Sequence, residues 1–315
     1  MHSSATSKVT GVLGAVGNTP LVELGRVVPP GSARVLVKLE WANPTGSMKD
    51  RMALSAIAGA IESGALTPGD TVVEYTAGST GISLAFVCAA LGYPIHIVSS
   101  DAFAAEKLRT MRAYGAFVEE VPSDHGQINE TLIRAVIDRA GEVAALPAHW
   151  ACDQLNNHDA IPGYFALGEE IWEQTGGAVS AFVQVVGTAH SIHGVGRVLR
   201  SHDPDVHLMA VEPAESAVLS GGPTGSHRIE GTGIGFVPPL WEPDQVDEIA
   251  QVTSDDAMQM ARRLAKDEGL FAGTSSGANV VAALGLAERL GPDATVVTIL
   301  CDSGLRYLST ELYGA

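Results

Sequence analysis

Basic residues are scarce in this sequence, and so are cysteines and long apolar runs. The 315 residues include 19 Lys and Arg against 36 Asp and Glu, which gives a formal net charge of −17. Because no basic surface of any size is available, the composition argues against a protein that binds nucleic acid or an anionic membrane. A small anionic ligand needs only a few local donors and is compatible with this charge.

Cysteine is used only three times, at Cys88, Cys152 and Cys301, and no two cysteines form a CxxC pair. A zinc ribbon or a redox motif is therefore not expected. A sparse and odd number of cysteines is typical of a reducing compartment. The cysteines thus predict a cytoplasmic protein.

No stretch of about 18 apolar residues is present that would predict a membrane span. The most apolar stretch, residues 82–98, is interrupted by glycine, proline and histidine. The first 18 residues lack the apolar core and the basic start of a secretory signal. We expect residues 1–15 to form a short mobile arm.

The rest of the chain alternates between short apolar runs and amphipathic runs, several of which stop at glycine. Strands are expected at residues 35–39, 71–76, 95–99, 117–121, 143–146, 182–186, 208–211 and 295–300. Helices are expected at residues 47–63, 80–91, 104–114, 128–140, 161–174, 191–200, 255–268, 276–290 and 305–313. Ser47 is the expected N-cap of the first helix, and Gly64, Gly92, Gly115 and Gly141 are the expected helix stops.

The expected strands are continuously apolar, as in a parallel sheet that helices cover on both faces. This pattern predicts an α/β protein of two doubly wound domains with mostly parallel sheets. We expect a smaller domain at residues 43–154 and a larger one at residues 16–42 plus 155–315. The irregular Gly/Pro-rich stretch at residues 220–243 is long enough to indicate a functional segment. In such folds ligands bind at the carboxyl ends of the strands.

The first strand-to-helix turn of interest holds Lys49 in the sequence Pro-Thr-Gly-Ser-Met-Lys-Asp-Arg. A lysine in the first turn of a helix lies near the positive end of the helix dipole, which favours its neutral amine. A neutral amine is what Schiff-base chemistry requires. A surface lysine at a helix start fits the position equally well.

Two further turns offer backbone N–H groups at a helix start. The turn at residues 76–81, Thr-Ala-Gly-Ser-Thr-Gly, suits a carboxylate or phosphate, or is a plain capping turn with Thr80 as N-cap. The turn at residues 187–194 looks like a phosphate cradle but lacks the dinucleotide and nucleotide-triphosphate fingerprints. A metal pair of His190 and His193 is disfavoured, because no nearby carboxylate or HExxH pattern completes a site.

The fourth turn, Gly273-Thr274-Ser275-Ser276-Gly277, matches the GxSxG pattern of α/β-hydrolases. Those enzymes place their catalytic histidine after the serine. The last histidine of this chain is His227, which precedes Ser275. The hydrolase interpretation is therefore disfavoured.

Taken together in order and spacing, these motifs resemble the cysteine synthase family, whose members are pyridoxal-phosphate enzymes of fold type II and which also includes the cystathionine β-synthases. The resemblance covers nearly the whole chain. It implies a fold similar to that of the tryptophan synthase β subunit. The motifs are Gly17-Asn18-Thr19-Pro20-Leu21, the Lys49 turn, the two turns at residues 76–81 and 187–194, Gly273-Thr274-Ser275-Ser276-Gly277-Ala278, and residues 302–310.

The resemblance implies roles for individual residues. Lys49 holds pyridoxal 5'-phosphate covalently and later takes the substrate α-proton. Ser275 faces the pyridine nitrogen, and the other cofactor contacts are Ser79, Gly187, Thr188, Ala189, His190 and Ser191. The amino-acid substrate binds to Thr76, Ala77, Gly78, Ser79, Thr80, Gln154 and Gly231. A homodimer is also implied.

The implied reaction removes the α-proton, expels the β-substituent and adds a nucleophile such as sulfide. A serine beside the pyridine nitrogen does not force its protonation as an aspartate does, which tunes the cofactor toward β-chemistry. The leading hypothesis is synthesis of L-cysteine, or an analogue, from an activated L-serine such as O-acetylserine. The alternatives are a β-eliminase (a cysteine desulfhydrase or a hydroxy-amino-acid dehydratase), a synthase that uses another nucleophile, and a binding protein without activity.

Two departures from the family pattern matter, one at Ser79 and one in the loop at residues 187–191. Ser79 stands where most members have an asparagine that contacts both the cofactor and the substrate, and serine lacks the two-ended amide. The loop Gly187-Thr188-Ala189-His190-Ser191 replaces the usual Gly-Thr-Gly-Gly-Thr, so that Ala189 and His190 lose backbone freedom. His190 either adds a donor to the cofactor phosphate or reaches into the substrate entrance.

Overall fold

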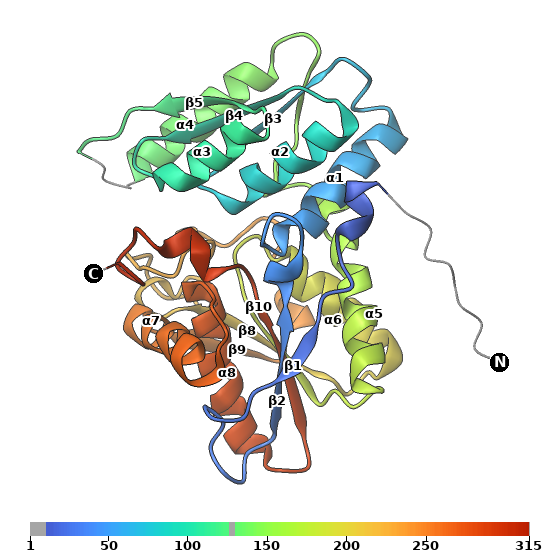
Figure 1. The fold of residues 1–315 in the computed structure, drawn as a ribbon, viewed down its shortest axis with the longest axis vertical. Coiled ribbons are helices and arrows are strands. Elements are labelled where there is room, and N and C mark those ends of the chain that lie inside the picture. The colour runs from blue at the N-terminus through green and yellow to red at the C-terminus, as the bar shows by residue number, and fades with distance from the viewer. Residues whose placement is uncertain (1–10, 126–129, 315) are drawn as a thin grey trace, which may run out of the picture.

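The computed structural model of the chain describes residues 11–125 and 130–314, whose strands form two separate sheets (Figure 1). In these residues the larger sheet has the order β1-β2-β10-β7-β8-β9, and the smaller sheet has the order β5-β4-β3-β6. The strands of the larger sheet are β1 (Leu21–Glu23), β2 (Arg34–Leu39), β7 (Ala181–Val185), β8 (His207–Pro213), β9 (Glu248–Val252) and β10 (Thr295–Leu300). Those of the smaller sheet are β3 (Thr71–Tyr75), β4 (Ile95–Ser100), β5 (Phe117–Val121) and β6 (His149–Ala151).

Parallel pairing dominates both sheets. The described pairs of the smaller sheet are all parallel, and in the larger sheet only the edge strand β1 runs antiparallel, with Leu21 opposite Lys38. The central strands β7 and β10 are buried along their whole length, because helices cover both faces of the sheet. The predicted α/β class with mostly parallel sheets is confirmed. The predicted boundaries of the two domains stay a prediction.

Eight α-helices lie in the described residues, and α1 lies at the junction of the two sheets (Figure 1). The helices are α1 (Lys49–Ser63), α2 (Ser79–Leu91), α3 (Ala105–Ala113), α4 (Glu130–Ala144), α5 (Phe165–Thr175), α6 (His190–His202), α7 (Ser254–Arg263) and α8 (Thr274–Leu290). Within these residues, no helix is both long and apolar enough to cross a bilayer.

Glycine in the left-handed region ends α1 at Gly64 and α2 at Gly92, as predicted. The predicted stop at Gly141 and the strand at residues 143–146 are wrong. Helix α4 continues to Ala144 because Val143 extends its buried stripe, and Gly141 lies on the open face. The predicted start of this helix at residue 128 lies outside the described residues.

Other boundaries also differ from the sequence-based expectation. The predicted helix at residues 305–313 is only a 3-10 turn, Gly304–Tyr307, begun by the Ser303 hydroxyl. The backbone beyond it is held by Arg262, which donates to the carbonyl oxygens of Glu311 and Leu312. Strands β1, β6 and β9 were not predicted. Residues 1–10 of the predicted arm lie outside the described residues, and Val12–Ala15 forms a 3-10 turn.

Candidate active site

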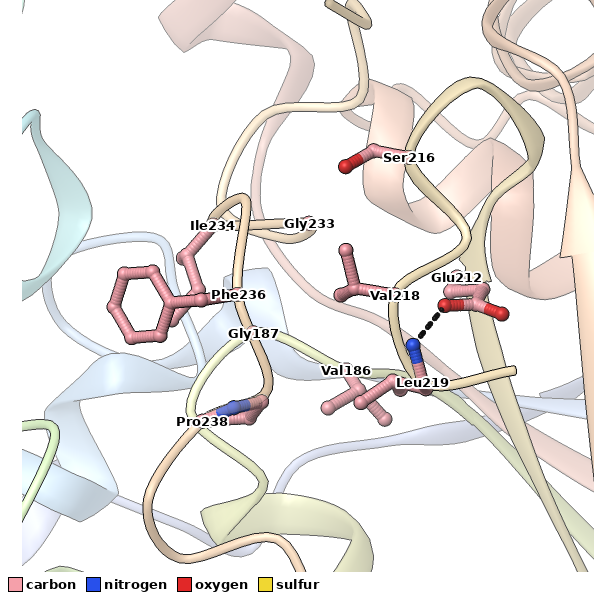
Figure 2. A pocket seen from close by; sticks show the side chains of 10 residues that line it. All are labelled: Val186, Gly187, Glu212, Ser216, Val218, Leu219, Gly233, Ile234, Phe236 and Pro238. Atoms are coloured by element: carbon pink, nitrogen blue, oxygen red, sulfur yellow. Dashed lines mark hydrogen bonds between the residues drawn. The ribbon is translucent and has the colours of Figure 1, made fainter. Parts of the chain in front are cut away.

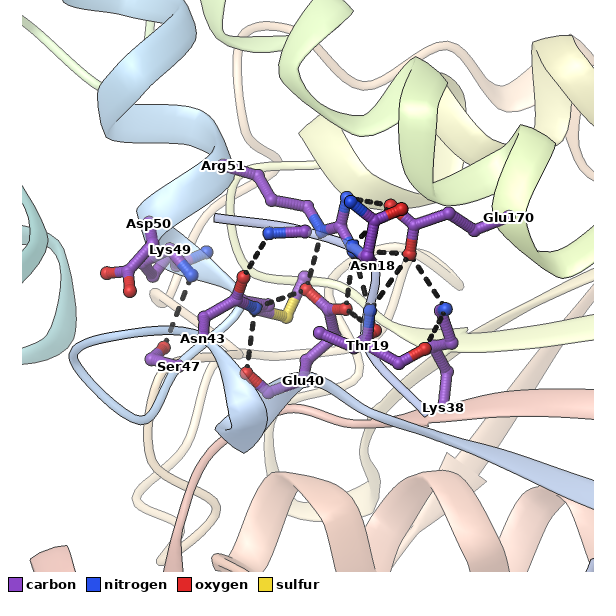
Figure 3. Close-up of polar contacts among 12 residues, drawn as sticks. Asn18, Thr19, Lys38, Glu40, Asn43, Ser47, Lys49, Asp50, Arg51 and Glu170 are labelled. Atoms are coloured by element: carbon purple, nitrogen blue, oxygen red, sulfur yellow. Dashed lines mark hydrogen bonds and ion pairs between the residues drawn. The ribbon is translucent and has the colours of Figure 1, made fainter. Parts of the chain in front are cut away.

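Lys49 is the first residue of α1, and this helix lies at the junction of the two sheets (Figure 1). Its side chain is partly buried, and this burial lowers the pKa of Lys49, although Cys301 and Asp302 act in the opposite direction. The predicted N-cap was one residue off. Met48 occupies that position, while the Ser47 hydroxyl accepts a bond from the Lys49 N–H at 3.3 Å (Figure 3). The amine is therefore shifted toward the neutral form that a nucleophile needs.

The turn at residues 76–81 joins β3 to α2. Helix α2 begins at Ser79 with Gly78 as N-cap, so the prediction of Thr80 as N-cap is wrong. The Thr80 hydroxyl instead donates to Oε1 of Gln154 at 2.7 Å, and Gln154 Nε2 donates to the carbonyl oxygen of Tyr75 at 3.3 Å. The structure thus brings Gln154 to this turn across 74 residues of sequence. Their roles in binding a carboxylate stay predictions.

The loop at residues 187–191 connects β7 to α6, and it is held against a second glycine segment. A Cβ atom at Gly187 would lie 2.3 Å from the carbonyl oxygen of Gly231, so the close approach requires glycine. Ala189 lies in the left-handed region with φ +68°. The Ser191 hydroxyl accepts a bond from Gln184 at 3.2 Å.

His190 and His193 both lie in α6, but their side chains contact different residues. The Thr188 hydroxyl and Nδ1 of His190 are 2.9 Å apart, and His190 interacts electrostatically with Lys49. His193 Nε2 accepts a bond from the Glu242 N–H at 3.1 Å, and its ring packs near Trp241. His190 is 1% exposed, and its predicted contact with the cofactor or with the substrate entrance stays a prediction.

Ser275 lies in the first turn of α8, and its hydroxyl acts to lower the pKa of the Cys301 thiol. The thiol also lies 3.5 Å from Nδ2 of Asn279. Burial raises the pKa of Cys301 to about 12, so the group beside Ser275 is a neutral thiol. Sequence reasoning treated Cys301 as an isolated cysteine. Its place at the end of an expected strand, directly before the motif at residues 302–310, was the available signal.

Two cations at the turn of residues 76–81 were also missed. Arg306 donates to the Ser79 hydroxyl at 2.5 Å and to the Thr45 carbonyl oxygen at 2.6 Å. The stem of Lys107 lies against Gly78, where a Cβ atom would be 2.6 Å from its Cδ, and its amine pairs with Glu230. Arg306 stands inside the motif at residues 302–310, whereas Lys107 carries no local signal.

A small cavity lies behind the Gly187 turn (Figure 2). It measures about 10 Å³, which is room for one water and too little for an amino acid. The Ser216 hydroxyl on its wall is buried and has no partner among the described residues. Glu212 on the same wall accepts a bond from the Leu219 N–H at 2.7 Å, so this cavity belongs to the packing of the loop.

Comparisons with known proteins find relatives along nearly the whole chain. The family model described as "Pyridoxal-phosphate dependent enzyme" matches residues 12–302. The chain is 41% identical over 312 residues to a cysteine synthase of Staphylococcus aureus (strain N315), covering 98% of each chain. It is 40% identical over 300 residues to a probable cysteine synthase of Bacillus subtilis (strain 168), covering 95% of this chain and 96% of the relative.

Among solved structures, O-acetyl serine sulfhydrylase isoform 3 from Entamoeba histolytica superposes with a TM-score of 0.91 at 38% identity. That superposition covers 99% of this chain and 94% of the other.

Proposed function

The chain belongs to the pyridoxal-phosphate dependent enzyme family, within it to the cysteine synthases, and from this premise we propose that it replaces the β-substituent of an activated L-serine. The nucleophile is sulfide or a related species, and the product is L-cysteine or an analogue. The observation that carries the proposal is Lys49, whose pKa is lowered by burial and whose amine interacts electrostatically with His190 and Cys301. The full-length similarity to cysteine synthases supports the same reaction.

The residues present fit pyridoxal 5'-phosphate. Lys49 offers an amine for the carbonyl group, and the start of α6 offers N–H groups for the phosphate. Ser275 and the neutral Cys301 thiol offer no negative charge for the pyridine nitrogen. When bound, the cofactor supplies an electron sink next to the substrate Cα.

The remaining residues bind and orient the substrate in this proposal. The N–H groups at the start of α2, together with Thr80 and Gln154, receive the carboxylate. Lys49 Nζ takes the α-proton, and its lowered pKa keeps the amine available in the neutral form that can accept this proton. Arg306 donates a hydrogen bond to the Ser79 hydroxyl and holds it in place, so these two groups form a second polar pair at the turn of residues 76–81.

β-Elimination is the alternative that one observation favours. Ser79 is shorter than the asparagine usual at this position, and its hydroxyl is engaged by Arg306. A weaker hold on the substrate would release a keto acid and ammonia in place of a replacement product. The two reactions separate when O-acetyl-L-serine is supplied with and without sulfide, and L-cysteine, keto acid and ammonia are measured.

The test of the whole proposal is the Lys49→Ala variant. We expect it to lose the visible absorption band of the covalently held cofactor and all turnover, because alanine has no amine for the covalent bond or for proton transfer. Lys266→Ala is the matched control, since Lys266 is exposed, and it should keep both. Turnover that persists in Lys49→Ala would refute the assignment.

We also propose a cytoplasmic homodimer. The buried free cysteines Cys88, Cys152 and Cys301 support a reducing compartment. Similarity along nearly the whole chain to the cysteine synthases supports the dimer implied by the resemblance. Light scattering on the eluting protein measures the oligomer, and a monomer mass would contradict the dimer. Cell fractionation tests the location.

A further inference from the structure

His190 leaves one ring nitrogen unused inside the candidate active site. The side chain is 1% exposed, and Nδ1 lies 2.9 Å from the Thr188 hydroxyl. Nε2 is fully buried and has no hydrogen-bond partner among the described residues. A buried polar atom without a partner is unfavourable, so a native site that contains one calls for an explanation.

The ring is neutral, which leaves it with one N–H group. Burial lowers the pKa of His190 to about 3, and the charge of Lys49 acts in the same direction. If Nδ1 carries the proton, Nε2 is an acceptor without a donor among the described residues. If the Thr188 hydroxyl donates to Nδ1, the proton lies on Nε2, and Nε2–H is a donor without an acceptor among the described residues.

The surroundings of the ring favour an anionic acceptor for that donor. His190 is the first residue of α6, which is 13 residues long, and the free N–H groups of its first turn attract negative charge. The preceding Ala189 adopts φ +68°, a strained conformation for an alanine.

We propose that Nε2–H of His190 donates a hydrogen bond to the phosphate group of the cofactor, with Thr188 fixing the tautomer by donating to Nδ1. The inference rests on the proposed function only in that the cofactor is pyridoxal 5'-phosphate. His190 then replaces, with a side-chain donor, part of what backbone N–H groups contribute in a glycine loop. The contact is specific for the phosphate and does not involve the ring or the aldehyde of the cofactor.

The test compares the full-length apoprotein with pyridoxal 5'-phosphate and with pyridoxal, which lacks the phosphate. His190→Ala should weaken the affinity for pyridoxal 5'-phosphate about 10- to 100-fold, the effect of one hydrogen bond to a charged group. The affinity for pyridoxal should stay unchanged. His190→Gln keeps an amide donor of similar reach and should restore most of the loss. His193→Gln is the matched control from the same helix.

Equal losses for both ligands, or no loss for either, would overturn the assignment. A second measurement needs no variant: in wild-type protein with ¹⁵N-labelled histidine, the ring shifts show which nitrogen carries the proton. A proton on Nδ1 of His190 in the holoenzyme would also overturn it. These readouts are independent of turnover, so failure of the β-replacement assay leaves the phosphate contact standing, and wild-type protein that binds no cofactor refutes the proposed function.

Discussion

Glu74, in the middle of the smaller sheet, shows how one buried carboxyl connects strand β3 to the candidate active site. Its Oε2 accepts a bond from the Gln154 N–H at 3.0 Å, and its Oε1 accepts one from the Tyr75 N–H at 3.0 Å. Burial raises the pKa of Glu74 to about 8, and the nearby charge of Asp153 acts in the same direction. The group is therefore protonated at neutral pH and positions Gln154 as a neutral acceptor.

Because the ordinary pKa of this carboxyl is 4.5 and burial raises it to about 8, Glu74 makes the stability depend on pH. Between pH 4.5 and about pH 8 the folded chain binds one proton more than the unfolded chain. The protonated Glu74 therefore contributes its full stabilisation below its unfolded-state pKa, and this contribution is lost as pH rises through its folded-state pKa. A tenfold difference in proton affinity between the folded and unfolded chain corresponds to about 1.4 kcal/mol. We expect the free energy of unfolding to fall less between about pH 5 and pH 8 in Glu74→Gln than in wild type.

Urea unfolding at several pH values measures this difference. Glu288→Gln, which alters an exposed carboxyl on α8, is the control and should follow the wild-type curve. A Glu74→Gln curve that also follows wild type would show that Glu74 is ionised in the folded protein.

Ser79 gives a second prediction at the scale of the residue. Its hydroxyl accepts a bond from Arg306 at 2.5 Å, and asparagine in its place offers both a carbonyl oxygen for Arg306 and an amide N–H for the substrate. Ser79→Asn should raise the ratio of L-cysteine to keto acid formed from O-acetyl-L-serine and sulfide. Ser63→Asn on exposed α1 surface is the control. An unchanged ratio in Ser79→Asn would show that Ser79 does not set the reaction outcome.

At the scale of the element, the turn after β7 depends on a contact between two glycine segments. A Cβ atom at Gly187 would lie 2.3 Å from the carbonyl oxygen of Gly231. The clash can be relieved only if one of the two backbone segments moves, because no flexible side chain is involved. We expect Gly187→Ala to lower the free energy of unfolding by about 1–3 kcal/mol and to weaken cofactor binding. Thermal unfolding and cofactor titration measure the two effects.

Gly285→Ala is the matched control, because Gly285 lies in the middle of α8 and a Cβ atom there meets no other atom within 4 Å. It should raise the free energy of unfolding by about 0.5–1 kcal/mol, the ordinary gain of alanine over glycine in a helix. Opposite signs for the two substitutions would separate steric conflict from helix propensity. A Gly187→Ala protein as stable as wild type would mean that the two segments move apart without loss.

The same elements show what the sequence can and cannot predict. Glycine stops and apolar runs predicted most helices and central strands, because both depend on neighbouring residues. They failed at Gly141, where the continued packing of Val143 outweighs the local preference. The turns of the site were found from local motifs, but the contact between Arg306 and Ser79 spans 227 residues, and local motifs do not show which residues pair over such a distance.

At the scale of the whole molecule, a buried cluster of charges joins the two parts of the chain beside Lys49 (Figure 3). Arg51 in α1 contacts Glu40 at 2.8 Å and Glu170 of α5 at 2.8 Å, and Lys38 of β2 contacts Glu170 at 2.7 Å. Burial alone raises the pKa of Glu170, but its bonds to Arg51 and Lys38 lower the pKa to about 2. The two cations and two anions of the cluster thus balance one another.

Replacing Arg51 by methionine leaves Glu40 and Glu170 without their main partner while keeping the bulk of the side chain. Breaking a buried ion pair from one side costs about 3–5 kcal/mol, so Arg51→Met should lower the free energy of unfolding by that amount. Arg139→Met removes exposed pairs with Glu119 and Glu142 and should change it by no more than about 1 kcal/mol. Urea unfolding measures both. Because Arg51 anchors the first turn of α1, its loss should also reduce the fraction of protein that holds the cofactor at Lys49. If Arg51→Met and Arg139→Met changed the free energy of unfolding and the cofactor content equally, the cluster would not fix this helix to the larger sheet.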